Sequence, residues 1–242
     1  SESQEIIKSM SVSGSVQAIL TLDADGTGTL VDLSQDANTT AQIAQRCGTD
    51  MAALLYSSGT TGRPKGIMLS HDNLRSNAEI LVNAWGFSSS DRLLHMLPIY
   101  HVHGLFVGIS CVLMSGASMS WHRSYNDDIA VTAMSKCTVM MGVPTYYTRL
   151  LNNHRFSPDC CQTMRLFISG SAPLLTETFH QFQARCGHTI LERYGMSETN
   201  MNTSNPLNGE RKPGTVGLPL PGVLLKIVDE EGHELLTNDI GN

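Results

Sequence analysis

Apolar and polar residues follow two patterns in the middle of the chain: short apolar runs, and longer stretches with apolar residues at helical spacing. The apolar runs, typical of strands, are 51–56, 92–97, 117–121, 137–141, 165–169 and 189–193. Stretches with helical character lie between them, at 71–85, 105–114, 127–134, 144–151 and 173–186. Strands that alternate with helices indicate an α/β fold with a mainly parallel sheet and flanking helices.

Residue types at the ends of these stretches support the predicted helices. Ser70 is a favourable N-cap, and Gly86 suits the left-handed position that ends a helix. Pro144 and Pro173 fit the first position of a helix, where a missing N–H costs nothing. We therefore expect helices to begin directly after Ser70 and at both prolines. The run 51–56 is predicted to be a buried strand.

The last forty residues follow a different pattern. Residues 202–222 are rich in Pro, Gly and Asn, which predicts a loop. Residues 223–228 and 234–236 flank the turn sequence Asp-Glu-Glu-Gly, which predicts a hairpin. We therefore divide the chain into an α/β part at 1–201 and, at 202–242, a loop and hairpin that begin an antiparallel β unit.

Composition narrows the classes of function. The 242 residues include 16 basic and 22 acidic side chains, a net charge of −6, which argues against nucleic-acid binding. A locally positive site for an anionic substrate remains compatible with this charge. No apolar stretch is long enough to span a membrane, and the six cysteines form no C-x-x-C pair. We expect a cytoplasmic protein, with no membrane or nucleic-acid partner.

The most informative segment is 56–66, Tyr-Ser-Ser-Gly-Thr-Thr-Gly-Arg-Pro-Lys-Gly, which follows a predicted strand. Glycines let backbone N–H groups approach an anion closely, and Lys65 adds a point charge suited to phosphate. Four hydroxyl side chains can also donate to phosphate oxygens: Ser57, Ser58, Thr60 and Thr61. The segment is not a Walker A loop, because Pro64 and Gly66 stand where that motif has Gly and Ser or Thr. It predicts a phosphate-binding loop of another type.

This segment resembles the signature of the adenylate-forming superfamily, which includes acyl-CoA synthetases, adenylation domains of peptide synthetases and luciferases. Further segments resemble the superfamily's motifs and follow in its order: L-P-I-Y-H at 97–101, S-G-S-A-P at 169–173, Y-G-M-S-E-T at 194–199 and G-T-V-G-L-P at 214–219. Ser197 stands where the family usually has Thr. The resemblance implies the large domain of these enzymes, which use ATP to convert a carboxylate into an acyl-adenylate and release pyrophosphate.

The resemblance also implies roles for individual residues. It assigns Thr60, Thr61, Lys65 and Glu198 to catalysis, with Glu198 as the ligand of Mg²⁺. Such catalysis works by positioning and charge neutralisation. The ATP- and AMP-binding residues that it implies are Ser57, Ser58, Gly59, Thr60, Thr61, Gly62, Lys65, Ser169, Gly170, Ser171, Ala172, Pro173, Glu192, Arg193, Tyr194, Gly195, Met196 and Ser197.

Longer strings, including L-P-I-Y-H-V-H-G-L-F and L-E-R-Y-G-M-S-E-T-N, resemble malonyl-CoA synthetases. These enzymes are ATP-dependent acid–thiol ligases that pass a small dicarboxylate to coenzyme A. The resemblance implies ATP, Mg²⁺ and coenzyme A as cofactors, and malonate or methylmalonate as substrate. We predict that His101 and Arg149 bind the distal carboxylate, because a guanidinium pairs well with carboxylates, and that Met196 shapes the α-carbon side. His103 is interpreted as a structural histidine.

Two parts of the family pattern have no counterpart in these 242 residues: the ribose-binding Asp motif and the mobile C-terminal domain with its lysine. We therefore expect the chain to be a fragment that is inactive alone. The alternatives are an ATP-binding module without turnover, a CoA ligase for another acid, or an adenylation domain with a different acceptor. A mitochondrial location is the alternative if a targeting peptide lies upstream, and the sequence leaves the oligomeric state open.

Overall fold

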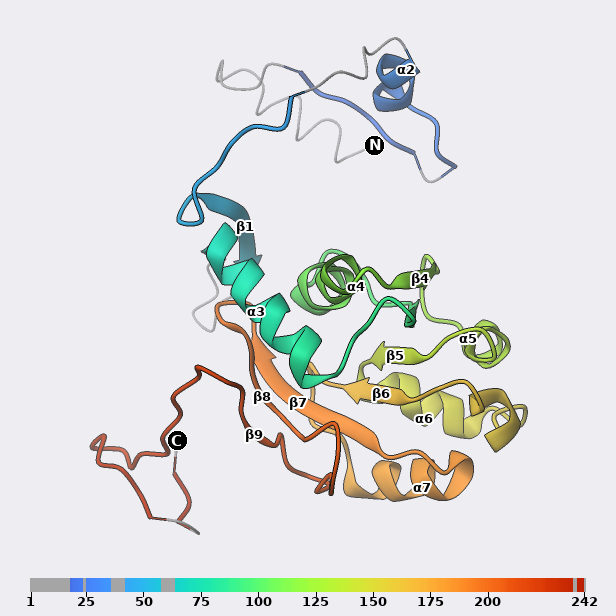
Figure 1. Ribbon diagram of the computed structural model, residues 1–242, viewed down its shortest axis with the longest axis vertical. Coiled ribbons are helices and arrows are strands. Elements are labelled where there is room, and N and C mark those ends of the chain that lie inside the picture. Colours follow the sequence, from blue (N-terminus) through green and yellow to red (C-terminus); the bar gives the residue numbers. More distant parts are fainter. Residues whose placement is uncertain (1–17, 24, 36–41, 58–63, 237–238, 242) are drawn as a thin grey trace. The chain divides into compact units, whose positions relative to one another are not determined.

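The computed structural model describes residues 18–23, 25–35, 42–57, 64–236 and 239–241 (Figure 1). The chain divides into two compact units, Ser1–Arg46 and Cys47–Asn242. Regular structure among the described residues of the first unit consists of helix α2 (Thr29–Gln35). The second unit holds the sheet and the candidate site.

A seven-stranded sheet organises the second unit, in the order β4-β3-β5-β6-β7-β8-β9. Neighbouring strands from β4 to β7 run parallel, whereas β8 and β9 are antiparallel to their neighbours. The mainly parallel α/β fold that the sequence predicts is therefore confirmed. The strands are β3 (Arg92–His95), β4 (Ser118–Trp121), β5 (Val139–Gly142), β6 (Leu166–Ser169), β7 (Ile190–Met196), β8 (Asn200–Ser204) and β9 (Leu218–Pro219).

Helices cover both faces of this sheet (Figure 1). One face is covered by α3 (His71–Ala84), a π-helical turn (His103–Gly108) and α4 (Ile109–Ser115). The other is covered by α5 (Asp127–Met134), α6 (Pro144–Asn152), the 3₁₀ turn Pro158–Cys161 and α7 (Thr176–Cys186).

Successive strand side chains point to opposite faces, so the sheet has two separate cores. Leu93 belongs to the core under α3 and α4, and its neighbour Leu94 to the core under α5, α6 and α7. Among the described residues, no helix has the length and apolar character needed to cross a bilayer.

The predicted helix ends are confirmed at three positions and wrong at one. Ser70 caps α3 in a reciprocal capping box with Asn73, Gly86 is left-handed with φ +60°, and Pro144 begins α6. Helix α7, however, begins at Thr176 instead of Pro173. Leu175 is extended (φ −66°, ψ 135°) and forms the N-cap, and the Leu174 N–H before it donates to the buried Glu192 carboxylate at 2.7 Å.

The prediction of a buried strand at 51–56 is correct about the strand and wrong about its burial. Strand β1 (Met51–Ser57) pairs with β2 (Lys65–Ser70) in a separate two-stranded antiparallel sheet. Within the described part of the chain β1 has no other strand neighbour, and side chains such as Tyr56, 71% exposed, face solvent.

The predicted loop at 202–222 is wrong at its start, because β8 continues to Ser204. Polar side chains take part in the core there: the Trp85 indole N–H donates to Ser204 Oγ at 3.0 Å, and Thr203 Oγ1 donates to the Val216 carbonyl at 2.8 Å. The predicted hairpin near the end consists of a single antiparallel bridge, Val228 to Glu234. The division at 201/202 stays a prediction, and β8 crosses it.

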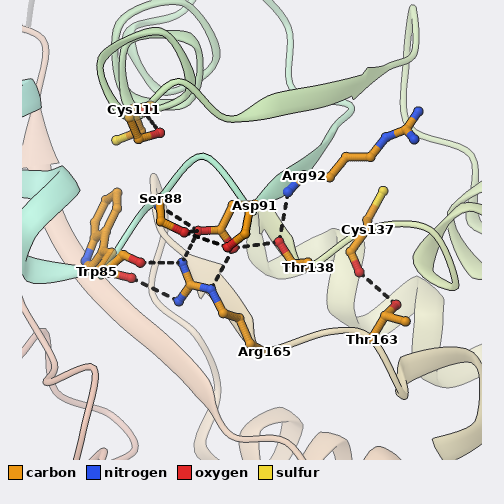
Figure 2. Close-up of polar contacts among 12 residues, drawn as sticks. Trp85, Ser88, Asp91, Arg92, Cys111, Cys137, Thr138, Thr163 and Arg165 are labelled. Atoms are coloured by element: carbon orange, nitrogen blue, oxygen red, sulfur yellow. Dashed lines mark hydrogen bonds and ion pairs between the residues drawn. The ribbon is translucent and has the colours of Figure 1, made fainter.

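An ion pair between the buried Asp91 and the half-buried Arg165 lies at the amino ends of the strands (Figure 2). Arg165 donates to both oxygens of Asp91, at 2.7 and 2.9 Å, and to the carbonyls of Trp85 and Gly86. Thr138 Oγ1 donates to Asp91 at 2.7 Å. Burial alone would raise the pKa of Asp91, but these hydrogen bonds outweigh it and lower the pKa to about 2. The network ties the end of α3 to β3, β5 and β6.

Candidate functional site

Two cavities meet at the carboxyl ends of the parallel strands, where α/β sheets bind ligands. Cavity 1 has a volume of about 410 Å³, and Leu97, Pro98, His101, His103, Val143, Met196 and Ser197 are among its lining residues. Cavity 2 has a volume of about 340 Å³, and Ala172, Pro173, Glu192, Tyr194 and Gly214 are among its lining residues. Three residues line both: Ser171, Arg193 and Gly195. These three residues therefore form a wall common to the two cavities.

Arg193 is the charged group in this shared wall. It lies on β7 and is 3% exposed, and its Nε and Nη2 atoms have no hydrogen-bond partner within the described residues. Burial lowers the pKa of Arg193 to about 10, so it stays cationic at neutral pH. An unpaired buried cation is costly, which favours an anionic ligand in the adjoining cavity.

Gly170 makes room for this arginine. It follows β6, and a Cβ atom at this position would overlap the Arg193 guanidinium. The glycine of the S-G-S-A-P segment is therefore required by close packing against Arg193.

His103 provides a second buried polar group in cavity 1. Its Nδ1 atom lies 3.2 Å from Ser171 Oγ, and its Nε2 atom has no partner within the described residues. Burial, together with the nearby charges of Arg193 and His95, holds the pKa of His103 well below its usual value. The ring is therefore neutral near pH 7 and can hydrogen-bond a ligand, a role that the sequence interpretation missed. The one available signal was its position two residues after His101, in the L-P-I-Y-H segment.

The structure does not bring His101 and Arg149 together. His101 is exposed and lines cavity 1. Arg149 lies in the last turn of α6, pairs with Asp127 Oδ1 at 2.6 Å and is not among the residues lining cavity 1. Its guanidinium also stacks over the Tyr125 ring, 4.7 Å from the centroid. In this arrangement Arg149 faces α5 in the outer helical layer, away from His101, which does not support the predicted shared carboxylate site.

Strand β7 continues past its predicted end at 193 and distributes side chains between the cavities. Its pairing with β8 is irregular between Tyr194 and Gly195. Tyr194 lines cavity 2 with its ring half exposed, whereas Met196 and Ser197 line cavity 1.

The segment after β6 forms part of both cavities. Ser171 has φ +70°, a left-handed conformation that is uncommon for a residue with a side chain. Ser169 is fully buried, and its Oγ has no partner among the described residues. Burial raises the pKa of Glu192, although the Leu174 N–H opposes the shift. Glu192 therefore fixes this segment through the backbone while it lines cavity 2.

The predicted phosphate loop can be located only through its flanks. Ser58, Gly59, Thr60, Thr61 and Gly62 lie outside the described residues. Ser57 and Lys65 are paired in the register of β1 and β2, and Lys65 is exposed. The roles predicted for this loop stay predictions.

Glu198 lies apart from both cavities, in a third cavity of about 320 Å³ that Asn77, Thr199 and Asn200 also line. Asn200 is 3% exposed, and its Oδ1 has no hydrogen-bond partner among the described residues. Carboxylate and amide oxygens are the donors that Mg²⁺ prefers, so this donor set is compatible with the predicted metal role of Glu198.

The chain is similar in sequence to proteins of one enzyme family. A profile of the family described as "AMP-binding enzyme" matches residues 1–242. A malonate–CoA ligase of Arabidopsis thaliana is 40% identical over 205 residues, which cover 75% of this chain and 33% of the plant protein. Human malonate–CoA ligase ACSF3, described as mitochondrial, is 39% identical and covers 74% of this chain and 34% of its own length.

The chain is also similar in fold and sequence to solved structures of other proteins. ATP-bound MatB from Rhodopseudomonas palustris is 48% identical, with a TM-score of 0.94, over 99% of this chain and 48% of that protein. A malonyl-CoA ligase in a ternary product complex with methylmalonyl-CoA and AMP is 37% identical, with a TM-score of 0.72, over 75% of this chain and 40% of that protein. The chain thus spans about a third of these curated relatives and less than half of these solved structures.

Proposed function

This chain belongs to the AMP-binding enzyme family, and on that basis we propose that it forms the ATP- and acid-binding part of an AMP-forming acid–CoA ligase. The acyl substrate we propose is a small dicarboxylate, malonate or methylmalonate. The buried cation Arg193, without a partner in the described residues, carries this proposal, because a simple fatty acid would leave it unpaired in cavity 1. The printed names of the malonate–CoA ligase relatives support the same substrate class.

In this proposal each cavity receives one substrate. The distal carboxylate binds Arg193 in cavity 1, where the neutral His103 Nε2 is a second donor. The adenosine binds in cavity 2, with the Tyr194 ring against the purine. Binding on the two sides of the common wall would bring the second carboxylate near the α-phosphate, and such a reaction needs this positioning.

The chemical steps follow from this placement. The free carboxylate oxygen attacks the α-phosphorus, and the bond to pyrophosphate breaks. The thiol of coenzyme A then attacks the acyl carbon, loses its proton and displaces AMP. We assign charge neutralisation to Lys65, Thr60 and Thr61. Mg²⁺ bound at Glu198 would add positive charge near the phosphates.

The location and partners follow the same proposal. ATP, coenzyme A and the acid are the small-molecule partners. The human relative is described as mitochondrial, and for this chain we keep the cytoplasm and the mitochondrial matrix as alternatives.

An acid-specificity assay on the full-length protein tests the proposal. AMP formation with coenzyme A is measured for malonate, methylmalonate, acetate and propionate. Arg193→Met removes the charge at similar length and should lower kcat/KM for malonate on the order of 100-fold, as expected when one partner of a buried charge pair is lost. Activity on propionate should hold or rise.

Arg149→Met is the matched control, because it removes an exposed arginine outside both cavities. It should leave the preference for malonate unchanged. A preference for acetate or fatty acids in the parent protein would refute the dicarboxylate proposal. ATP binding without AMP formation for any acid would instead favour a binding module without turnover.

A further inference from the structure

A fourth cavity lies away from the two substrate cavities, between α5 and the edge strand β4. Its volume is about 510 Å³, and its lining includes four basic side chains: Arg92, His122, Lys136 and Arg155. We propose that this basic cavity binds a phosphate-bearing anion. The charge of the lining carries this inference, whereas the two probes used below, pyrophosphate and coenzyme A, rest on the proposed function.

Side chains on one face of β3 and β4 form one wall of the basic cavity. Asp91 points into the ion pair with Arg165, whereas Figure 2 shows the Arg92 side chain directed away from that network. In the sheet register, Ser120 on β4 pairs with Leu94, so it shares the α5-facing side with Arg92. His122 follows β4, and its Nε2 lies 3.1 Å from Ser120 Oγ.

The opposite wall comes from α5 and the residues after it. Asp128 is the one acid in the lining, and it is already compensated: Asn153 donates to it at 2.9 Å, and Arg155 Nη1 lies 3.8 Å away. Arg92 and Lys136 form no ion pair within the described residues. The basic cavity therefore keeps an excess of positive charge in a chain whose net charge is −6.

The chemistry of the lining selects the class of ligand. A guanidinium offers paired donors to phosphate oxygens, and an ammonium adds a point charge. Ser120 adds a hydroxyl group, whereas the Thr132 hydroxyl already donates to the Asp128 carbonyl. Among the described residues, the His122 imidazole is the one aromatic ring in the lining. We therefore infer recognition of the phosphate groups themselves, whether of inorganic pyrophosphate or of coenzyme A.

Lysine acetylation followed by mass spectrometry tests this inference on the full-length protein. Modification of Lys136 is measured with increasing pyrophosphate and, in a second arm, coenzyme A. We expect protection of Lys136 in at least one arm, and the arm that protects at lower concentration identifies the source of the phosphate. Exposed Lys226 is the internal control, and Lys65 reports separately on the predicted nucleotide loop.

Two variants show whether protection arises in the basic cavity. Arg92→Ala should raise the concentration for half-protection of Lys136 about tenfold or more, because a charged hydrogen bond is lost. Arg75→Ala removes an equal charge from the exposed side of α3 and should have no effect. Absence of Lys136 protection in both arms would overturn the inference, and so would an equal loss of protection in both variants. A Lys136 that is unreactive without any anion would also overturn it, because another part of the protein would then fill the cavity.

Discussion

At the scale of single residues, Glu192 and Arg193 are neighbouring charged residues in β7 with different surroundings. Glu192 is buried and accepts the Leu174 N–H, so its carboxylate shapes the segment that follows β6. Arg193 is buried beside it, but its Nε and Nη2 lack protein partners in the described residues. A charged residue within an otherwise apolar strand was visible in the sequence. The sequence did not show that the protein provides a hydrogen-bond partner for Glu192, or that Arg193 faces a cavity.

Packing between Gly170 and Arg193 gives a prediction at this scale. Gly170→Ala should destabilise the protein by about 1–3 kcal/mol, because the added methyl overlaps the guanidinium. In an Arg193→Ala background the same change should cost much less. Urea denaturation of the four proteins in this double-mutant cycle measures the coupling. Equal costs in both backgrounds would show that Gly170 is required for another reason.

At the scale of elements, β7 joins two kinds of sheet. It pairs in parallel with β6 through Glu192 and then antiparallel with β8 from Arg193 onward. The apolar run 189–193 predicted a strand that ends at residue 193. Instead the strand continues, because β8 provides a second partner, and the irregular pairing at Tyr194 and Gly195 serves both cavities.

At this scale, the capping box of α3 predicts how a substitution at the N-cap changes stability. Ser70→Ala should lower the free energy of unfolding by about 1 kcal/mol, because the Asn73 N–H loses its acceptor. Ser76→Ala, on the exposed surface of the same helix, should change stability by less than about 0.5 kcal/mol. Urea denaturation measures both. A loss at Ser76 as large as that at Ser70 would contradict a capping role.

At the scale of the whole unit, structure and function lie at opposite edges of the sheet. The Asp91–Arg165 ion pair joins α3, β3, β5 and β6 at the amino ends of the strands, while cavities 1 and 2 lie at the carboxyl ends. A change at the ion pair therefore alters stability without touching a residue that lines cavity 1 or cavity 2.

This ion pair predicts how stability depends on pH. The pKa of Asp91 is about 2 in the folded protein, below its usual value of 3.8. Its contribution, on the order of 2 kcal/mol, is therefore complete above about pH 4 and is lost as the pH falls toward 2. Denaturation between pH 2 and 6 should show this loss in the parent protein.

Asp91→Asn should remove that part of the pH dependence and cost on the order of 2 kcal/mol at pH 7, because Arg165, which is 33% exposed, loses its carboxylate partner. Glu79→Gln is the control, because it removes a carboxylate from an exposed pair with Arg75. It should change stability by less than about 1 kcal/mol. If the parent and Asp91→Asn proteins lost stability in parallel below pH 4, other carboxylates would be responsible.

The sequence by itself determined the alternation of helices and strands from α3 to β7, the capping of α3 and the family resemblance, because local periodicity and short motifs encode these features. It placed Arg149 in the substrate site because that arginine lies near the right motif along the chain. Only the tertiary structure decided that Arg149 pairs with Asp127 and that Arg193 faces cavity 1. Side-chain burial and partnership depend on which strands and helices pack together, and the spacing of residues along one chain does not specify those contacts.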